Sequence, residues 1–224
     1  MRSDFNGNLE RRQTPDDKRK AADSVGIPQD RDLIDYLPVT RERWPDLWEL
    51  FEASATEELG NPSRCWCMEL RLGDRARWQA QCKSPSEDNR RDMAAIIRSG
   101  NTPGILAYHA GEPVGWCSVS PREQLVGLDE AYRSQDADNS RVWSVVCFYV
   151  PEAQRGNGLI LGLLRAAVGF AIDSGAQIVE GYPVTAEVVG DGAAGTVPIF
   201  AAAGFVEVAS VNPQQCVMRY LLGR

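Results

Sequence analysis

The sequence predicts an α/β protein of the mixed (α+β) kind, with a central sheet that is largely antiparallel and contains one parallel pair of strands. Two observations predict antiparallel pairing: apolar runs at 104–108 and 114–119 flank a Gly/Pro turn, and short runs at 206–208 and 216–220 form a second pair. A third predicts the parallel pair: residues 142–150 and 177–182 are strand-like and enclose a helical stretch at 159–173.

We expect a tail at 1–31 and a single domain at 32–224. The tail mixes basic and acidic side chains with few large apolar groups, so it lacks the material for a core. The domain then opens with a short strand at 33–39 and a helix in which Trp44, Leu47, Trp48 and Phe51 recur at helical spacing. A second helix is expected at 87–98, closed by Gly100.

The second half of the chain supplies the rest of the sheet. Residues 142–150 are rich in β-branched and aromatic side chains, which favours a central strand buried on both faces. A polar loop at 121–141 precedes this strand, and a short helix is expected at 197–203 before the last hairpin.

Composition excludes several classes of protein. The chain of 224 residues is 43% hydrophobic and 25% charged, as in ordinary globular proteins. Its net charge of −7 argues against nucleic acid or an anionic membrane as a partner and favours a cationic one. The start of the chain has no apolar signal segment, so we expect a cytoplasmic protein with reduced cysteines.

The segment Arg155-Gly156-Asn157-Gly158 lies where a buried strand turns into a helix. Glycine lets the backbone approach a ligand, and the first N–H groups of a helix have no partner within it. Such a turn binds anions, and a pyrophosphate would satisfy several donors at once. Taken alone, Gly-x-Gly before a helix is a weak signal.

Two other phosphate-binding motifs can be compared with this segment. A P-loop requires Gly-Lys-Ser/Thr, which does not follow Gly156. The dinucleotide motif G-x-G-x-x-G is nearly met by Gly156, Gly158 and, one place late, Gly162, with Glu180 near the position of the ribose-binding acid. The order of elements disfavours it, because hairpins precede and follow the unit.

Over residues 32–224 the chain resembles the GNAT superfamily of N-acyltransferases. The order of its elements is similar, and Arg155 and Gly158 fit the superfamily's coenzyme motif Gln/Arg-x-x-Gly-x-Gly/Ala, whereas Ile160 departs from it. The resemblance implies helices on both faces of the sheet and an acetyl group transferred from acetyl-CoA to an amine by direct attack. It also implies a coenzyme site formed by Phe148, Tyr149, Val150, Arg155, Gly156, Asn157, Gly158, Leu159 and Ile160.

The resemblance is weaker at the catalytic positions. Phe200 stands where the superfamily often has the tyrosine that protonates the leaving thiolate, and Ala193 stands where an asparagine is frequent. We therefore predict Tyr182 as a substitute acid, with packing at the strand end as the alternative. Glu180 is the predicted base, with a solvent-facing strand residue as the alternative, and Glu130 is a weaker candidate.

Trp116, Ser118 and Arg122 lie on or just after the first hairpin, where the superfamily often builds the acceptor side, so they are candidate acceptor contacts. No metal is expected, because Cys65-Trp66-Cys67 lacks a second ligand pair; we expect this segment and Arg71 near the acceptor groove or in the core. His109 is expected at the surface.

Two further functions remain open at this point: a catalytically silent sensor that binds acyl-CoA, and a dinucleotide-dependent oxidoreductase. The acceptor is expected to be a small-molecule or peptidyl amine, and its identity and the length of the acyl group are left open. The oligomeric state is also open, with a homodimer as one option.

Overall fold

A computed structural model describes residues 33–53, 61–82, 86–128, 141–185, 193–220 and 222. These residues belong to one unit, Leu33–Arg224, and the predicted tail at 1–31 lies outside the described residues. Glu130 also lies outside them.

The sheet has seven strands in the order β1-β2-β3-β4-β5-β7-β6. Only the β4–β5 pair is parallel, and the other five pairs are antiparallel. This confirms the predicted mixed sheet with one parallel strand–helix–strand unit. The strands are β1 (Ile34–Pro38), β2 (Gly104–His109), β3 (Glu112–Pro121), β4 (Val142–Tyr149), β5 (Ile178–Gly181), β6 (Phe205–Asn212) and β7 (Gln215–Tyr220).

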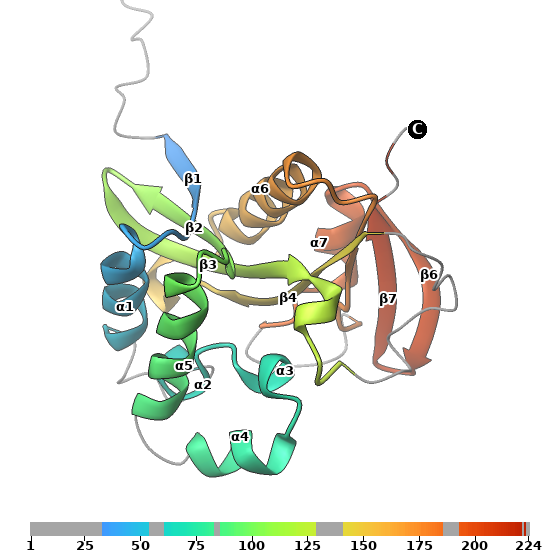
Figure 1. Cartoon of the computed structure of the whole chain (residues 1–224). Helices are drawn as coiled ribbons and strands as arrows, with labels where there is room; N and C mark the ends of the chain where they lie inside the picture. Colours follow the sequence, from blue (N-terminus) through green and yellow to red (C-terminus); the bar gives the residue numbers. More distant parts are fainter. Residues whose placement is uncertain are drawn as a thin grey trace, which may run out of the picture. The chain divides into compact units, whose positions relative to one another are not determined.

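Helices cover both faces of the sheet, as predicted (Figure 1). Helix α6 (Leu159–Asp173) packs on β2 and β3 and joins a core cluster with the buried Phe200 of α7 (Val197–Ala202). On the other face, α1 (Trp44–Glu52) and α5 (Glu87–Arg98) enclose a second cluster, in which Phe51, Trp66 and Trp116 are buried.

Three short helices between α1 and α5 were not predicted: α2 (Pro62–Cys65), α3 (Glu69–Leu72) and α4 (Arg75–Gln81). None is long enough to show a helical repeat of apolar residues, which explains why the sequence pattern missed them. Their start signals are local: the side chains of Asn61 and Asp74 cap α2 and α4. A 3-10 turn, η2 (Arg122–Gln124), follows β3, and another, η4 (Glu152–Gln154), follows β4.

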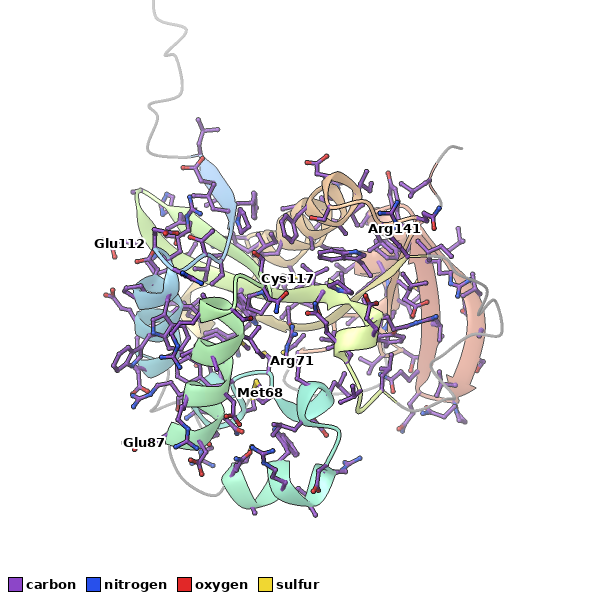
Figure 2. All side chains as sticks on the ribbon, viewed as in Figure 1. Met68, Arg71, Glu87, Glu112, Cys117 and Arg141 are labelled. Carbon is purple, nitrogen blue, oxygen red and sulfur yellow. The ribbon has the colours of Figure 1, made fainter. Side chains whose placement is uncertain are left out.

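Arg71 fastens α3 to the sheet. Its Nη2 donates hydrogen bonds to the carbonyl oxygen of Pro103 at 3.0 Å and to the Ser118 hydroxyl at 3.2 Å. Figure 2 shows the side chain extending from α3 toward β3, where Cys117 is labelled. Burial lowers the pKa of Arg71 to about 10, because its guanidinium has lost water without gaining a carboxylate. The loss of solvation around Arg71 is therefore the energetic cost of holding α3 in place.

Candidate active site

Strands β4 and β5 separate beyond their fourth paired residue. Their ladder runs from Val142–Ile178 to Val145–Gly181, after which β4 continues through Tyr149 paired only with β3 among the described strands. A shift in the β3–β4 register falls at the same place, between Ser118 and Val119. The edge of β4 from Val146 to Tyr149 thus turns backbone groups toward the opening between the two strands.

One of those groups is already engaged. The Phe148 N–H donates to the carbonyl oxygen of Ala193 at 2.6 Å, on the side away from β3. Because successive N–H groups of a strand point in opposite directions, the N–H of Val150 faces the same opening and that of Tyr149 faces β3. Among the three residues predicted to bind pantetheine through their backbone, Val150 is therefore the best placed and Phe148 must first release Ala193.

The turn before α6 has the geometry of an anion site. Gly156 and Gly158 have φ of 84° and 75°, which glycine adopts without strain, and the turn is exposed. No side chain caps α6, so the donors of its first turn point outward. Arg155 Nε donates to the Val150 carbonyl oxygen at 3.0 Å, which ties the turn to the end of β4.

A cavity of about 310 Å³, which we call the turn cavity, lies at this point. Six of the nine predicted coenzyme residues line it. The lining residues are Val150, Gln154, Arg155, Gly156, Gly158, Leu159, Ile160, Leu161 and Ile199.

Two further cavities share a wall formed by Glu69, Leu70, Val146 and Ala194. The thiol cavity, of about 410 Å³, is lined in addition by Asn61, Pro62, Cys65, Cys67, Trp78, Cys147, Phe148, Tyr149 and Ala193. The outer cavity, of about 500 Å³, is lined in addition by Gly73, Arg75, Val126, Gly127, Leu128, Tyr182 and Gln215. Since Val146 is the first β4 residue past the ladder with β5, both cavities adjoin the opening between the strands.

Glu180 and Tyr182, the predicted base and acid, belong to a buried network. Glu180 is 0% exposed; its Oε1 accepts from Arg122 Nη1 at 3.0 Å and its Oε2 lies 3.3 Å from Arg219 Nε. The alternative that Glu180 faces solvent is therefore wrong. The Tyr182 hydroxyl donates to Glu180 Oε1 at 2.7 Å and hydrogen-bonds Ser144 at 2.9 Å.

This network has a structural role whatever its part in catalysis. Burial, and then the negative charge of Glu180, raise the pKa of Tyr182 well above its ordinary value, so its hydroxyl keeps its proton. Tyr182 lines the outer cavity, whereas Glu180 reaches no cavity described above. Their catalytic roles stay predictions.

The predicted acceptor contacts are not brought together at a surface. Trp116 and Ser118 are both 0% exposed: Trp116 Nε1 donates to Cys67 Sγ at 3.3 Å, and Ser118 supports Arg71. A wholly buried side chain offers no area to a ligand, so these two predictions do not fit the structure. Arg122, with a side chain 16% exposed, is paired with Glu180.

Phe200 occupies a core position. Its ring is 0% exposed and fills the space above Gly181, where a Cβ would overlap it. Its centroid lies 6.2 Å from that of Phe148 and 5.0 Å from that of Phe205. Phe200 therefore packs in the core and carries no polar group toward the opening between β4 and β5.

Glu69 is the site residue that sequence reasoning missed. It stands in the wall shared by the thiol and outer cavities, it is half-buried, and it makes no hydrogen bond or ion pair with the described residues. Burial raises the pKa of Glu69, with Arg75 opposing the shift. No sequence signal could have found it, because α3 is a single turn whose place depends on Arg71 and on distant strands.

The six cysteines are free thiols; Cys65 and Cys67 line the thiol cavity, and Cys67 is buried with Trp66 in the core cluster under α1. Trp66 and Cys67 have φ of 48° and 49°, which is strained for these residue types. Hydrogen bonds between neighbouring thiols, and then burial, raise the pKa values of Cys65 and Cys67, so both remain protonated. Within the described ranges, no three His, Cys, Asp or Glu side chains are arranged to hold a metal.

Together, a parted parallel pair of strands, a glycine turn at a helix start and adjoining cavities define the architecture of a coenzyme-dependent acyltransferase. A model of the acetyltransferase (GNAT) family matches residues 42–186. The chain belongs to this family, which confirms the resemblance recognised from the sequence.

Solved structures share the fold at low sequence identity. AAC(6')-Ib in complex with ribostamycin and coenzyme A is 16% identical, with 85% of this chain and 94% of that chain covered and a TM-score of 0.51. A GNAT acetyltransferase from Listeria monocytogenes is 12% identical (83% and 93% covered, TM-score 0.51). A protein from Bacillus halodurans is 14% identical (83% and 82% covered, TM-score 0.51). No curated protein matches the chain.

None of the helices in the described part of the chain is both long and apolar enough to cross a membrane.

Proposed function

We propose that the protein is an N-acetyltransferase that moves the acetyl group of acetyl-CoA to a primary amine. The turn Arg155-Gly156-Asn157-Gly158 carries the proposal, because it opens α6 with uncapped backbone donors beside the parted strands. Family membership supports acetyl transfer as the class of reaction. An aminoglycoside and coenzyme A, bound in one structural neighbour, support an amine acceptor.

The residues of the turn fit the diphosphate of the coenzyme. A Cβ at Gly156 or at Gly158 would meet no atom within 4 Å, so the space above the turn is open. The N–H groups of Leu159 and Ile160 would bind the diphosphate together with the helix dipole, and Arg155 would add positive charge. Asn157, also exposed in the turn, would contribute its backbone N–H.

The strands would hold the thioester end. Acetyl-CoA is consumed as a cosubstrate and supplies an activated acetyl group. The Val150 N–H, or that of Phe148 after it leaves Ala193, would donate to the carbonyl oxygen as negative charge develops there. The thiol and outer cavities would receive the amine, since both adjoin this stretch of β4.

The near match to a dinucleotide motif has a structural explanation. A Cβ on Gly162 would overlap the Tyr36 hydroxyl, so this glycine is required for packing between α6 and β1. Its role does not depend on a nucleotide.

Coenzyme preference and turnover test the proposal. Acetyl-CoA should raise the melting temperature, NAD should not, and free CoA should be released when an amine panel is added. Stabilisation by NAD alone would contradict the proposal. Stabilisation by acetyl-CoA without thiol release from any amine would instead favour the acyl-CoA sensor, to which the buried Phe200 lends support.

The role of Tyr182 is tested by Tyr182→Phe. Because its hydroxyl donates to Glu180 and hydrogen-bonds Ser144, we expect the variant to lose about 1–2 kcal/mol of stability from the loss of these two hydrogen bonds. If the hydroxyl also protonates the thiolate, kcat should fall by about 100-fold while CoA affinity is unchanged. A wild-type kcat would limit Tyr182 to the buried network.

A further inference from the structure

The strongest unassigned feature is the wall between the thiol and outer cavities. Glu69 is the one acidic side chain among the described residues that line either cavity, and Arg75 is the one arginine. The Glu69 side chain forms no hydrogen bond or salt bridge with the described residues; the charge of Arg75 acts on it from the same cavity without a direct ion pair, so its carboxylate oxygens can accept from a ligand. An available, half-buried carboxylate beside the parted strands favours a cation as its partner.

The position of Glu69 is fixed from several sides. Arg71 holds α3 to Pro103 and Ser118, and the Gly127 N–H donates to the Leu70 carbonyl oxygen at 2.8 Å. Gly73, with φ of 66°, closes α3 against Val126. These contacts hold the backbone of α3, so Glu69 stays in the cavity wall and only its side chain has to be ordered on binding.

The two cavities differ in what they offer beyond Glu69. In the thiol cavity, the side chains are mainly apolar or aromatic, with Pro62, Leu70, Trp78 and Tyr149 among them, and the thiols of Cys65 and Cys67 are protonated. The outer cavity carries Arg75, which repels a second positive charge. The two cavities together therefore suit an acceptor with one ammonium group on an apolar body better than an acceptor with several ammonium groups.

We propose that Glu69 binds the acceptor ammonium and removes its proton, and that the acceptor is a monoamine with an apolar body held in the thiol cavity. This inference rests on the proposed function. The Glu69 carboxylate takes one proton from the ammonium, and the freed lone pair attacks the acetyl carbonyl carbon. The C–N bond forms and the C–S bond breaks; of the two protons the nitrogen loses, one reaches the departing CoA thiolate and the other passes from Glu69 to solvent.

Other titratable groups face the same space and enter the pH profile. They are Arg75 from α4, Tyr182 after β5, and the thiols of Cys65, Cys67 and Cys147; Cys82 also lies close enough to sense the charge of Glu69. Burial raises the pKa of the Cys82 thiol to about 11. Of the residues that line these two cavities and have a resolved pKa direction, Glu69 is the one that changes charge below neutral pH.

The decisive comparison is Glu69→Gln, which keeps the shape and removes the charge, against Glu49→Gln on the exposed face of α1. Wild type and both variants are assayed for thiol release with 2-phenylethylamine, spermine and kanamycin across pH. Binding of CoA, and of 2-phenylethylamine to the CoA complex, is measured separately by calorimetry.

We expect 2-phenylethylamine to have the highest kcat/KM in the wild type. Glu69→Gln should lower that value by about 100-fold near neutral pH and weaken amine binding, while CoA binding stays unchanged. The loss should shrink as pH approaches the pKa of the amine, because solution then supplies the neutral form. Glu49→Gln should behave as wild type.

Two results would overturn the inference about Glu69 and leave the proposed function standing. They are a wild-type kcat/KM in Glu69→Gln, or a clear preference for spermine or kanamycin. Failure of the wild-type protein to bind CoA is a different result, because it would remove the proposed function itself.

Discussion

Gly158→Glu is expected to weaken CoA binding by about 100-fold, or ~2.7 kcal/mol, and to leave the fold intact. The new carboxylate would stand at the start of α6, where the diphosphate should dock, and like charges would repel there. A Cβ at this exposed position meets no neighbouring atom within 4 Å, so we expect the structural cost to come mainly from the positive φ of 75°. Calorimetry with CoA and thermal unfolding measure the two effects separately.

Two variants separate charge from backbone strain. Gly158→Asn is neutral and tolerates a left-handed conformation, so its affinity should stay within about 5-fold of wild type. Gly111→Glu adds the same charge to another open glycine of positive φ, in the β2–β3 turn, and should bind CoA normally. Equal weakening in all three variants would show that the effect is not local to the turn.

Glu180→Ala is expected to destabilise the protein by about 3–5 kcal/mol, which corresponds to a Tm lower by roughly 10 °C. The carboxylate is 0% exposed and serves Arg122, Arg219 and Tyr182 at once. Its removal takes from the Arg219 guanidinium, whose side chain is 8% exposed, the carboxylate with which it forms an ion pair. Chemical denaturation measures the free energy of unfolding.

The matched control is Glu207→Ala on exposed β6, which should change stability by no more than about 0.5 kcal/mol. Replacing Glu180 and Arg219 together by Met should restore part of the loss, because the buried charge of Arg219 is then removed along with the carboxylate that pairs with it. If Glu180→Ala and Glu207→Ala are equally stable, the network does not stabilise the fold.

The sheet was predictable because its signals are local. The strand at 142–150, the turn at 156–158 and the helix at 159–173 each carry their own periodicity or glycine signature. The predicted coenzyme-binding turn at 155–158 follows from this order of elements. Most of the residues predicted to bind the coenzyme line the turn cavity.

The candidate acceptor contacts were not predictable, because their surroundings are formed by residues far away in the sequence. Trp116 and Ser118 lie on the expected strand, but their burial depends on α1 and α3, which pack over them from far along the chain. The sequence left open that Glu180 faces solvent, because it does not show that Arg122 and Arg219 pair with its carboxylate. Glu69 belongs to a helix of four residues with no periodicity of its own.

A crystal structure with CoA tests the central claim most directly. We expect the diphosphate to lie against the N–H groups at the start of α6 and pantetheine to run along β4 past Val150. Ala193 should have moved away from the Phe148 N–H. A coenzyme bound elsewhere, with this turn still empty, would contradict it.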